Sequence, residues 1–234
     1  MVSVHESTLT RSRMFALERN DVPQAAGYRA DVRHHRCAWA VNGADTTYLR
    51  YHDNEWGVPC YDDRQLFETL LLETARVGLS CPAILRKRDS YRVAFEDFDP
   101  ARVAAFSDAR AEKLLRTGGI VRHRQKVMAA INNARRFLEV QQEFGSFATY
   151  LWRFVDGRPV QNRFLRLEDV PARTVLSDTV SRDMRSRGFR YVGSRTVYAY
   201  LQATGVVNDH LAGCFRHACV MQLADPSRIR PALG

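Results

Sequence analysis

Helical periodicity dominates this chain from Cys37 onward, and it is the feature that most limits the folds open to it. Most of the periodic runs begin at a capping residue or end at glycine, as helices do. Asp62 and Asp63 can cap one run, Ser80 with Pro82 begins another, and strand-like alternation is nearly absent. We therefore predict an all-α fold, with brief strand pairing conceivable over 158–167 alone. The predicted helices cover 62–77, 80–95, 107–117, 122–140, 146–155, 177–187 and 194–204.

The 234 residues suffice for a sizeable core, in one large domain or two small lobes. Residues 1–35 are polar and weakly periodic, which predicts a loosely ordered extension. The patterned part then forms one domain over 36–220, and 221–234 form a frayed tail. No apolar run approaches the roughly 18 residues of a membrane span, and the first residues lack a signal-peptide core. We expect a cytoplasmic protein that does not engage a membrane.

A strong positive charge narrows the choice of partner. Lysine and arginine exceed the acidic residues by 9, and the sequence pI is about 9.7. This balance favours a polyanion, with nucleic acid ahead of an anionic membrane surface. The alternative explanation for the positive charge is that the whole sequence is enriched in arginine and alanine, whatever the partner. The five cysteines are an odd number, which favours a metal site or free thiols over disulfides.

One acid interrupts the apolar run LLLETARVGLSC, residues 70–81. At helical spacing Glu73 shares a face with Leu66, Leu70 and Val77, so it points where its apolar neighbours point. A buried carboxylate is costly unless it is paired. Glu73 either lies at the edge of the stripe, paired with an arginine, or lines an apolar pocket where it stabilises a cation.

Four aromatic residues precede this acid: Trp39, Tyr48, Tyr51 and Trp56. Tyr48 and Tyr51 are i, i+3 neighbours on one helical face. Aromatic residues grouped in this way usually pack in the hydrophobic core. Beside a pocket acid they can instead stack on a planar, electron-poor ring.

Two pairs of metal-ligand residues lie at opposite ends of the chain. His210 and Cys214 are spaced i, i+4, and Cys37 and His52 are 15 residues apart. Together they could form a closed tetrahedral site of the structural zinc type, which would join the beginning of the chain to its end. Each pair taken alone is more often accidental.

A basic helix, a glycine-bearing turn and a second helix follow one another over residues 185–205. Gly188 and Gly193 would allow a DNA backbone to approach the turn closely. The N–H groups at the start of the second helix could bind a phosphate. This arrangement suits a sequence-independent DNA grip, although an ordinary helical hairpin looks the same. The phosphate-binding residues would be Gly193, Ser194, Arg195 and Thr196.

These motifs together resemble the type I 3-methyladenine DNA glycosylase family. The resemblance rests on RCAWAV, YHDNEWGVP, LFETLLLE, GLS, LRKR, GGIVRHRQKV, RGFRYVG and GVVNDHLAGC, in that order over residues 36–217. Two extra residues lie between Cys37 and His52. The resemblance implies an all-α helix-hairpin-helix glycosylase fold with two helical lobes. It also implies a structural zinc bound by Cys37, His52, His210 and Cys214, acting as a clip between the lobes.

The resemblance further implies a function and residue roles. The enzyme would flip an N-alkylated purine out of duplex DNA and hydrolyse its N-glycosidic bond in base excision repair. Glu73 would contact the base, within a pocket that Trp39, Tyr48 and Tyr51 help to form. We place Trp56 in the same pocket as a member of the same aromatic group. Leu79, next to Gly78, would wedge into the gap that the base leaves. The family lacks a general-base aspartate, which suits a cationic base that leaves readily. We expect a monomer.

The departures from the family pattern gather around the pocket. Cys81 stands where the family usually has tryptophan, Ala75 and Arg76 where it has glutamine-like residues, and Pro82 where it has an aliphatic residue. We therefore expect a wider, less aromatic and more basic pocket, suited to 3-methyladenine or to a bulkier N3- or N7-alkyl purine. The alternative is a non-catalytic DNA-binding relative that keeps the scaffold and has lost the pocket.

Overall fold

The fold is all-α, as predicted. A computed structural model describes residues 35–41, 45–117 and 119–223. The predicted extension over 1–35 and tail over 221–234 lie outside these residues, except for His35 and 221–223. The described helices are α1 (Ala38–Val41), α2 (Thr46–Asn54), α3 (Asp63–Arg76), α4 (Cys81–Leu85), α5 (Arg88–Ala94), α6 (Pro100–Ala104), α7 (Asp108–Thr117), α8 (Arg124–Phe144), α9 (Phe147–Trp152), α10 (Val175–Ser186), α11 (Ser194–Ala203) and α12 (Phe215–Leu223). None of them is long and apolar enough to cross a bilayer.

Strand structure in the described residues is limited to one short parallel pair. Val160–Gln161 (β1) pairs with Val207–Asn208 (β2), which realises the brief pairing expected within 158–167. The described residues also form 3₁₀ turns over Arg153–Val155 and Leu167–Asp169, and a left-handed turn over Glu96–Phe98, where φ is +51° to +56°.

Several predicted helix boundaries differ from the structure. The helix expected over 122–140 covers Arg124–Phe144, and the one expected over 146–155 ends at Trp152 and continues as a 3₁₀ turn. The helix expected over 80–95 is two helices, because the chain turns at Arg86 and Lys87 between α4 and α5. The helix expected to start at Ser177 starts two residues earlier, at Val175. Its N-cap is Thr174, whose hydroxyl accepts from the Ser177 N–H while the Ser177 hydroxyl accepts from the Thr174 N–H. Ser177 is thus the third residue of a capping box rather than the cap itself.

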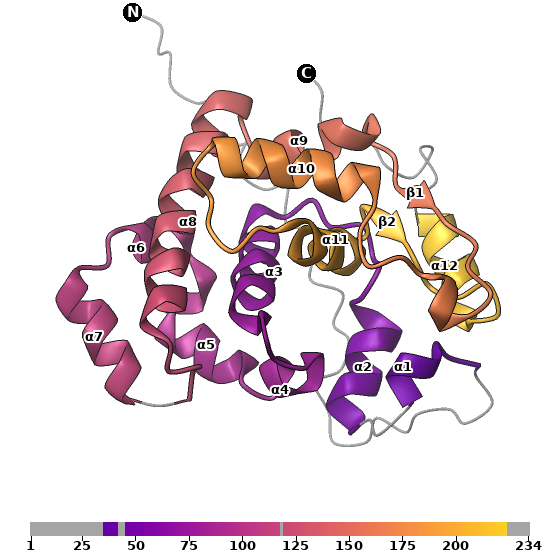
Figure 1. Ribbon diagram of the computed structural model, residues 1–234, viewed down its shortest axis with the longest axis horizontal. Helices are drawn as coiled ribbons and strands as arrows, with labels where there is room; N and C mark the ends of the chain where they lie inside the picture. The colour runs from indigo at the N-terminus through magenta and orange to yellow at the C-terminus, as the bar shows by residue number, and fades with distance from the viewer. Residues whose placement is uncertain (1–34, 42–44, 118, 224–234) are drawn as a thin grey trace, which may run out of the picture.

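Helix α3 lies at the centre of the molecule (Figure 1). It packs against α8, α9 and α11, so buried residues, polar as well as apolar, occupy almost its whole circumference from Leu66 to Ala75. The aromatic rings of Phe67, Phe137 and Phe147 join three of these helices, with the last two stacked at a centroid separation of 4.0 Å. Because α3 is enclosed in this way, a carboxylate on its last turns is held in a fixed, largely dry place.

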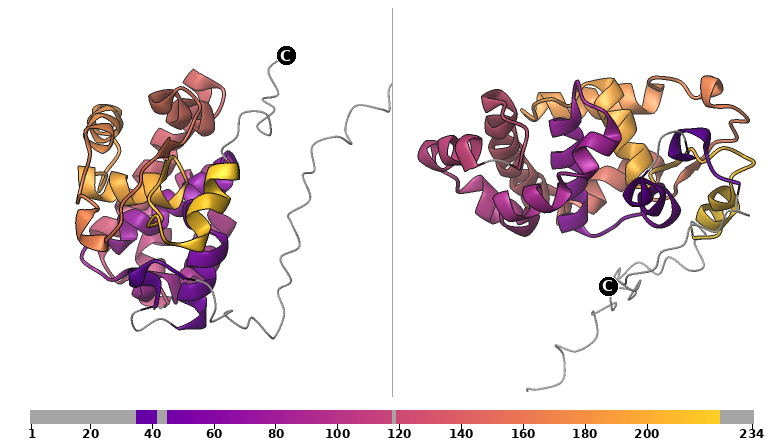
Figure 2. Two further views of the ribbon diagram at one scale, coloured as in Figure 1. Left: turned by 90° about the vertical axis from the view of Figure 1, so that its right-hand side faces the viewer. Right: turned by 90° about the horizontal axis from the view of Figure 1, so that it is seen from below.

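The beginning and the end of the described chain lie side by side. In Figures 1 and 2 the α1–α2 segment lies next to β2 and α12. The Phe215 N–H donates to the carbonyl of His35, and the His52 and His210 rings lie 4.9 Å apart. The two halves of the predicted metal site therefore meet.

One glycine allows a close approach that places the segment after α2. Gly205 has φ +69°, and a Cβ there would overlap the backbone of Val58 and Pro59. The neighbouring Thr204 carbonyl accepts from the Cys60 N–H at 3.0 Å. A side chain at 205 would separate the end of α11 from the chain that carries Trp56.

Candidate active site

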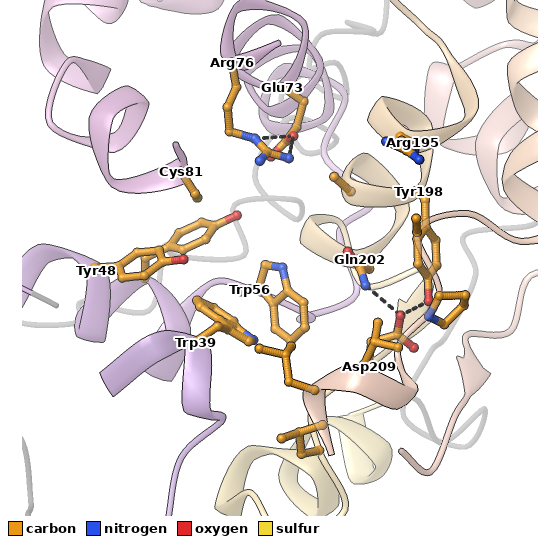
Figure 3. A pocket seen from close by; sticks show the side chains of 17 residues that line it. Trp39, Tyr48, Trp56, Glu73, Arg76, Cys81, Arg195, Tyr198, Gln202 and Asp209 are labelled. Carbon is orange, nitrogen blue, oxygen red and sulfur yellow. Dashed lines mark hydrogen bonds and ion pairs between the residues drawn. The ribbon is translucent and has the colours of Figure 1, made fainter. Parts of the chain in front are cut away.

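A cavity of about 300 Å³ opens between α2, α3 and α4 on one side and α11 with residues 167–172 on the other (Figure 3). The structure brings all six predicted pocket residues to its wall: Trp39, Tyr48, Tyr51, Trp56, Glu73 and Cys81. The wall also contains Arg195, which we predicted to bind a DNA phosphate, and four polar residues that we did not predict as site residues: Arg76, Tyr198, Gln202 and Asp209. The cavity is thus aromatic on one side and polar on the other.

Glu73 lies in the penultimate turn of α3 and is 7% exposed. Arg76, one turn later, donates to its Oε2 through Nε at 2.9 Å and Nη2 at 2.6 Å. No described residue donates to Oε1. Burial raises the pKa of the Glu73 carboxyl, and the Arg76 guanidinium opposes that rise. Both sequence interpretations are therefore partly realised, since Glu73 lines the cavity and is paired with an arginine.

The aromatic residues form one connected group. The Trp39 ring lies 5.2 Å from that of Tyr48 and 4.9 Å from that of Trp56, the latter edge to face. Tyr51 projects from the next turn of α2, and burial followed by the nearby Cys81 and Glu73 raises the pKa of its hydroxyl well above its ordinary value. These rings are fixed against one another and present π faces and edges to the cavity.

Cys81 is the first residue of α4, directly after the N-cap Ser80 and before Pro82. Burial, and then the neighbouring Glu73, raises the pKa of its thiol to about 12. The side chain is therefore a neutral thiol, small and polarisable, at a point where the wall borders both Tyr48 and Glu73. It leaves room that a large aromatic side chain would fill.

The opposite wall is held by Asp209, which is buried beneath it. Its Oδ1 accepts from Asn162 Nδ2 at 2.6 Å, and its Oδ2 accepts from Gln202 Nε2 at 2.8 Å and from the Tyr198 hydroxyl. Tyr198 and Gln202 are i, i+4 neighbours on α11, a spacing that could have indicated a shared face. With three donors bound, Asp209 fixes the wall and is not a free base.

The tight turn after α3 has the geometry of a type II β-turn. Val77 has φ −47° and ψ 120°, Gly78 has φ +80°, and the Leu79 N–H donates to the Arg76 carbonyl at 2.7 Å. A residue with positive φ at the third position favours glycine. Lys126 of α8 caps the end of α3 by donating to the Ala75 and Val77 carbonyls at 2.9 and 2.5 Å. Lys126 was not among the predicted site residues.

The side chains at the tip of this turn face solvent. Val77 and Leu79 are 40% and 41% exposed. Leu79 does not line the cavity but lies just beyond the helix that carries Glu73. An exposed leucine on a fixed turn beside a pocket is the arrangement that an inserting wedge requires.

Helices α10 and α11 pack together as a helical hairpin. Asn133 of α8 fixes its turn, since Oδ1 accepts from the Arg190 N–H at 2.8 Å and Nδ2 donates to the Arg190 carbonyl at 3.0 Å. Gly188 has φ +85°, and Gly193 is the N-cap of α11. Because Gly193 has no side chain to cap the helix, the N–H groups of Ser194, Arg195 and Thr196 remain available to an anion. Arg195 also reaches the cavity wall.

The four predicted metal ligands converge in a buried cluster, and their ligand atoms all lie within 4.8 Å of one another. His210 Nδ1 is 3.6 Å from Cys37 Sγ and 3.7 Å from Cys214 Sγ, and His52 Nε2 is 3.5 Å from Cys214 Sγ. A tetrahedral site with ligand bonds of about 2.0–2.3 Å has ligand–ligand separations of roughly 3.3–3.8 Å. This Cys₂His₂ set therefore fits a metal ion.

Hydrogen bonds around the cluster orient both histidines. His52 Nδ1 lies 2.7 Å from the Asp53 carboxylate, which Arg36 also binds through Nε and Nη2. His210 Nε2 lies 3.0 Å from the carbonyl of Trp56. Each ring can thus donate from one nitrogen and leave the other for a metal, as metal-binding histidines do.

The surroundings of the two cysteines favour the thiolate form at one of them, Cys214. A hydrogen bond between them lowers the pKa of Cys214 and raises that of Cys37, and the two histidines further stabilise a Cys214 thiolate. Thiolate is the form that binds metals.

Comparison with known proteins places this geometry in a family context. The family described as Methyladenine glycosylase matches residues 39–217. DNA-3-methyladenine glycosylase 1 of Escherichia coli K12 is 42% identical over 179 residues, covering 76% of this chain and 95% of that protein. A crystal structure of 3-methyladenine DNA glycosylase I superposes with a TM-score of 0.74 at 45% identity, covering 77% and 98% of the two chains. A variant of such an enzyme in complex with 3-methyladenine superposes with a TM-score of 0.73 at 36% identity, covering 75% and 95%.

Proposed function

The chain belongs to the methyladenine glycosylase family, and from this we propose that it excises N-alkylated purine bases from DNA by hydrolysing the N-glycosidic bond. The lesion would be 3-methyladenine or a bulkier N3- or N7-alkyl purine. The observation that carries the proposal is the cavity in which a buried carboxylate, Glu73, faces a fixed group of aromatic rings. A planar, electron-poor ring between these two elements is bound by stacking and by charge.

The chemistry follows from the charge of the lesion. Alkylation at N3 makes the purine cationic, so its bond to the sugar breaks readily and the base leaves neutral. The pocket then needs to extrude the nucleotide and to bind the cationic base, by stacking and by charge, in position for bond cleavage. Glu73 supplies the charge contact through Oε1, which no described residue occupies. Water completes the hydrolysis and leaves an abasic site.

We propose that duplex DNA is gripped outside the cavity by the hairpin and the turn after α3. The N–H groups of Gly193, Ser194, Arg195 and Thr196 would bind a phosphate. Leu79, held by Gly78 in its type II turn, would enter the gap left by the extruded nucleotide. The formal charge of +9 supports a contact with the DNA backbone that is independent of sequence.

The metal ion that we propose for the Cys₂His₂ cluster is zinc. Two thiolates and two imidazoles in a closed tetrahedral set are the typical ligands of structural zinc. The cluster lies behind the Trp39 and Trp56 rings and contributes no ligand atom to the cavity, so its role is to hold the walls together. No step of base release passes through it.

We further propose a monomer that acts in the cytoplasm. The cavity, the hairpin and the metal cluster are each complete within one chain. None of the five cysteines is in a disulfide, which suits a reducing compartment.

The test of the proposed function is release of free base from alkylated duplex DNA. Dimethyl sulfate-treated DNA is incubated with the protein, and released purines are separated and quantified. We expect methylated purine to appear with matching abasic sites. Binding to the same DNA without any release would instead identify a non-catalytic DNA-binding relative.

A further inference from the structure

Arg76 occupies the cavity beside the carboxylate that is proposed to bind the base. Its guanidinium and the Glu73 carboxylate meet on the α3 side, facing the space that Tyr48 and Trp56 border (Figure 3). The Nε–H and one Nη2–H donate to Glu73 Oε2. A guanidinium has five N–H groups, so three remain, two on Nη1 and one on Nη2. No described residue accepts from them.

This ion pair changes what the pocket offers a cationic base. With Arg76 bound, the charge of Glu73 is balanced before any ligand enters, and the pair as a whole is close to neutral. A cationic purine therefore gains less from charge here than beside an unshared carboxylate. Recognition must depend more on matching hydrogen-bond donors and acceptors.

The donors and acceptors of the pair follow a defined order. The end of the guanidinium presents Nη1–H and Nη2–H as a two-pronged donor, and the free Oε1 of Glu73 next to it is an acceptor. Guanine presents the complementary order along one edge, with N7 and O6 as acceptors and N1–H as the next donor. Adenine in the same position presents an amino group to the guanidinium and an unprotonated N1 to the carboxylate. Guanine therefore satisfies both residues, and adenine opposes both.

We propose that Arg76 is a specificity-determining residue that, with Glu73, selects N3-alkylated guanine over N3-alkylated adenine. This inference rests on the proposed function. Alkylation at N3 leaves O6, N7 and the N1 position of guanine on the far edge of the ring. It also makes the guanine of the substrate cationic, so that it leaves as a neutral base in the same reaction and only the preferred base differs. The small Cys81 thiol leaves space on the adjoining wall for either purine.

The experiment compares the release of two bases from one substrate. Duplex DNA treated with dimethyl sulfate carries both N3-methylguanine and N3-methyladenine, and the initial release rate of each is measured for the parent, Arg76→Gln and Arg76→Lys. One bidentate arginine contact to guanine discriminates by about 5- to 150-fold. We expect the guanine-to-adenine ratio to fall by about that factor in Arg76→Gln. Arg76→Lys keeps the charge but loses the fork, and should lose most of the ratio as well.

The control is Arg64→Gln, which removes an exposed arginine paired with Asp99 away from the cavity. It should leave the ratio unchanged. If the parent and both Arg76 variants release the two bases in the same ratio, the inference is wrong. If Arg76→Gln weakens DNA binding equally for all substrates without changing the ratio, Arg76 contacts phosphate and the inference is also wrong. Release of no purine at all by the parent, from this DNA or from DNA that carries larger alkyl groups, would refute the proposed function itself.

A binding measurement guards against a variant that does not fold. Trp39 and Trp56 line the cavity, so their fluorescence reports occupancy by free base in the parent protein. The parent should bind free 3-methylguanine more tightly than 3-methyladenine. Tighter binding of 3-methyladenine would overturn the inference without any variant.

Discussion

Replacing Glu73 with glutamine tests whether its negative charge is required for base release. The change keeps the size and shape of the side chain and removes its charge. In the parent, the carboxylate binds Arg76 through Oε2 and leaves Oε1 for a base. In the variant, the amide oxygen can still accept from Arg76, but the other atom becomes an NH₂ donor. A base that donates to Oε1 then meets a donor instead of an acceptor.

The expected magnitude follows from this single contact. A hydrogen bond to a charged group contributes about 1.5–3 kcal/mol, which corresponds to roughly a ten- to hundredfold lower rate of release. The loss of stability should be smaller. The Arg76 side chain is 27% exposed and can turn to water when its partner loses charge, so we expect a change within about 1 kcal/mol.

The assay is single-turnover release of methylated purine from duplex DNA, together with thermal unfolding and DNA binding. The matched control is Glu139→Gln on α8. Glu139 also pairs with an arginine at i, i+3 spacing, Arg136 at 2.8 Å, but its side chain is 53% exposed. The control should release base at the parent rate. Parent-like release by Glu73→Gln, or its outright unfolding, would show that Glu73 serves Arg76 and the fold rather than the base.

Four further measurements test other parts of the site. Because burial raises the pKa of Glu73 and Arg76 opposes that rise, activity should decline as pH falls through a carboxyl pKa above the ordinary range, and Arg76→Gln should move this decline to higher pH. Cys81→Trp should shift the ratio of released bases towards 3-methyladenine and away from larger alkyl purines, by about 2- to 13-fold if one aromatic contact of ~0.5–1.5 kcal/mol is gained; an unchanged ratio would contradict the wider pocket. Binding to undamaged duplex should weaken steeply with salt, and Gly193→Leu should weaken it equally for all sequences; salt-independent binding would contradict the backbone grip. Untreated protein should contain close to one equivalent of zinc, and chelation should lower its melting temperature and alter tryptophan emission; less than about half an equivalent would count against the metal.

The fold class could be predicted from the sequence because its signals are local. Ser146 and Ser107 accept from N–H groups three residues later, as their positions before apolar runs predict. The interruption at Arg86 and Lys87 could not be predicted, because the residues on either side continue the helical pattern. There the chain turns so that Tyr91 enters the core, where its hydroxyl oxygen accepts a hydrogen bond from the Val121 N–H at 3.1 Å.

The site was only partly predictable, for a related reason. Glu73 could be identified because an acid in an apolar stripe is conspicuous. The pairing with Arg76 requires knowing that the arginine, one turn later, folds back into the cavity instead of extending to solvent. Lys126 was missed because its two partners lie 49 and 51 residues away in the sequence. Asp209 was missed because its partners Gln202 and Asn162 lie 7 and 47 residues away. No local sequence pattern marks such contacts.

The metal cluster and the cavity share their supporting residues, so neither can change alone. Helix α2 carries Tyr48 and Tyr51 towards the cavity and His52 towards the cluster, and Trp39 contacts both the Tyr48 and His52 rings. On the opposite wall, Asp209 holds α11 through Tyr198 and Gln202, and it directly precedes His210 in the sequence. The His210 ring in turn contacts the Trp56 carbonyl. The Cys37–His52 pair and the His210–Cys214 pair therefore meet in a cluster that lies against residues of both walls. This explains how a pocket built from segments some 150 residues apart can keep the spacing that stacking on a purine requires.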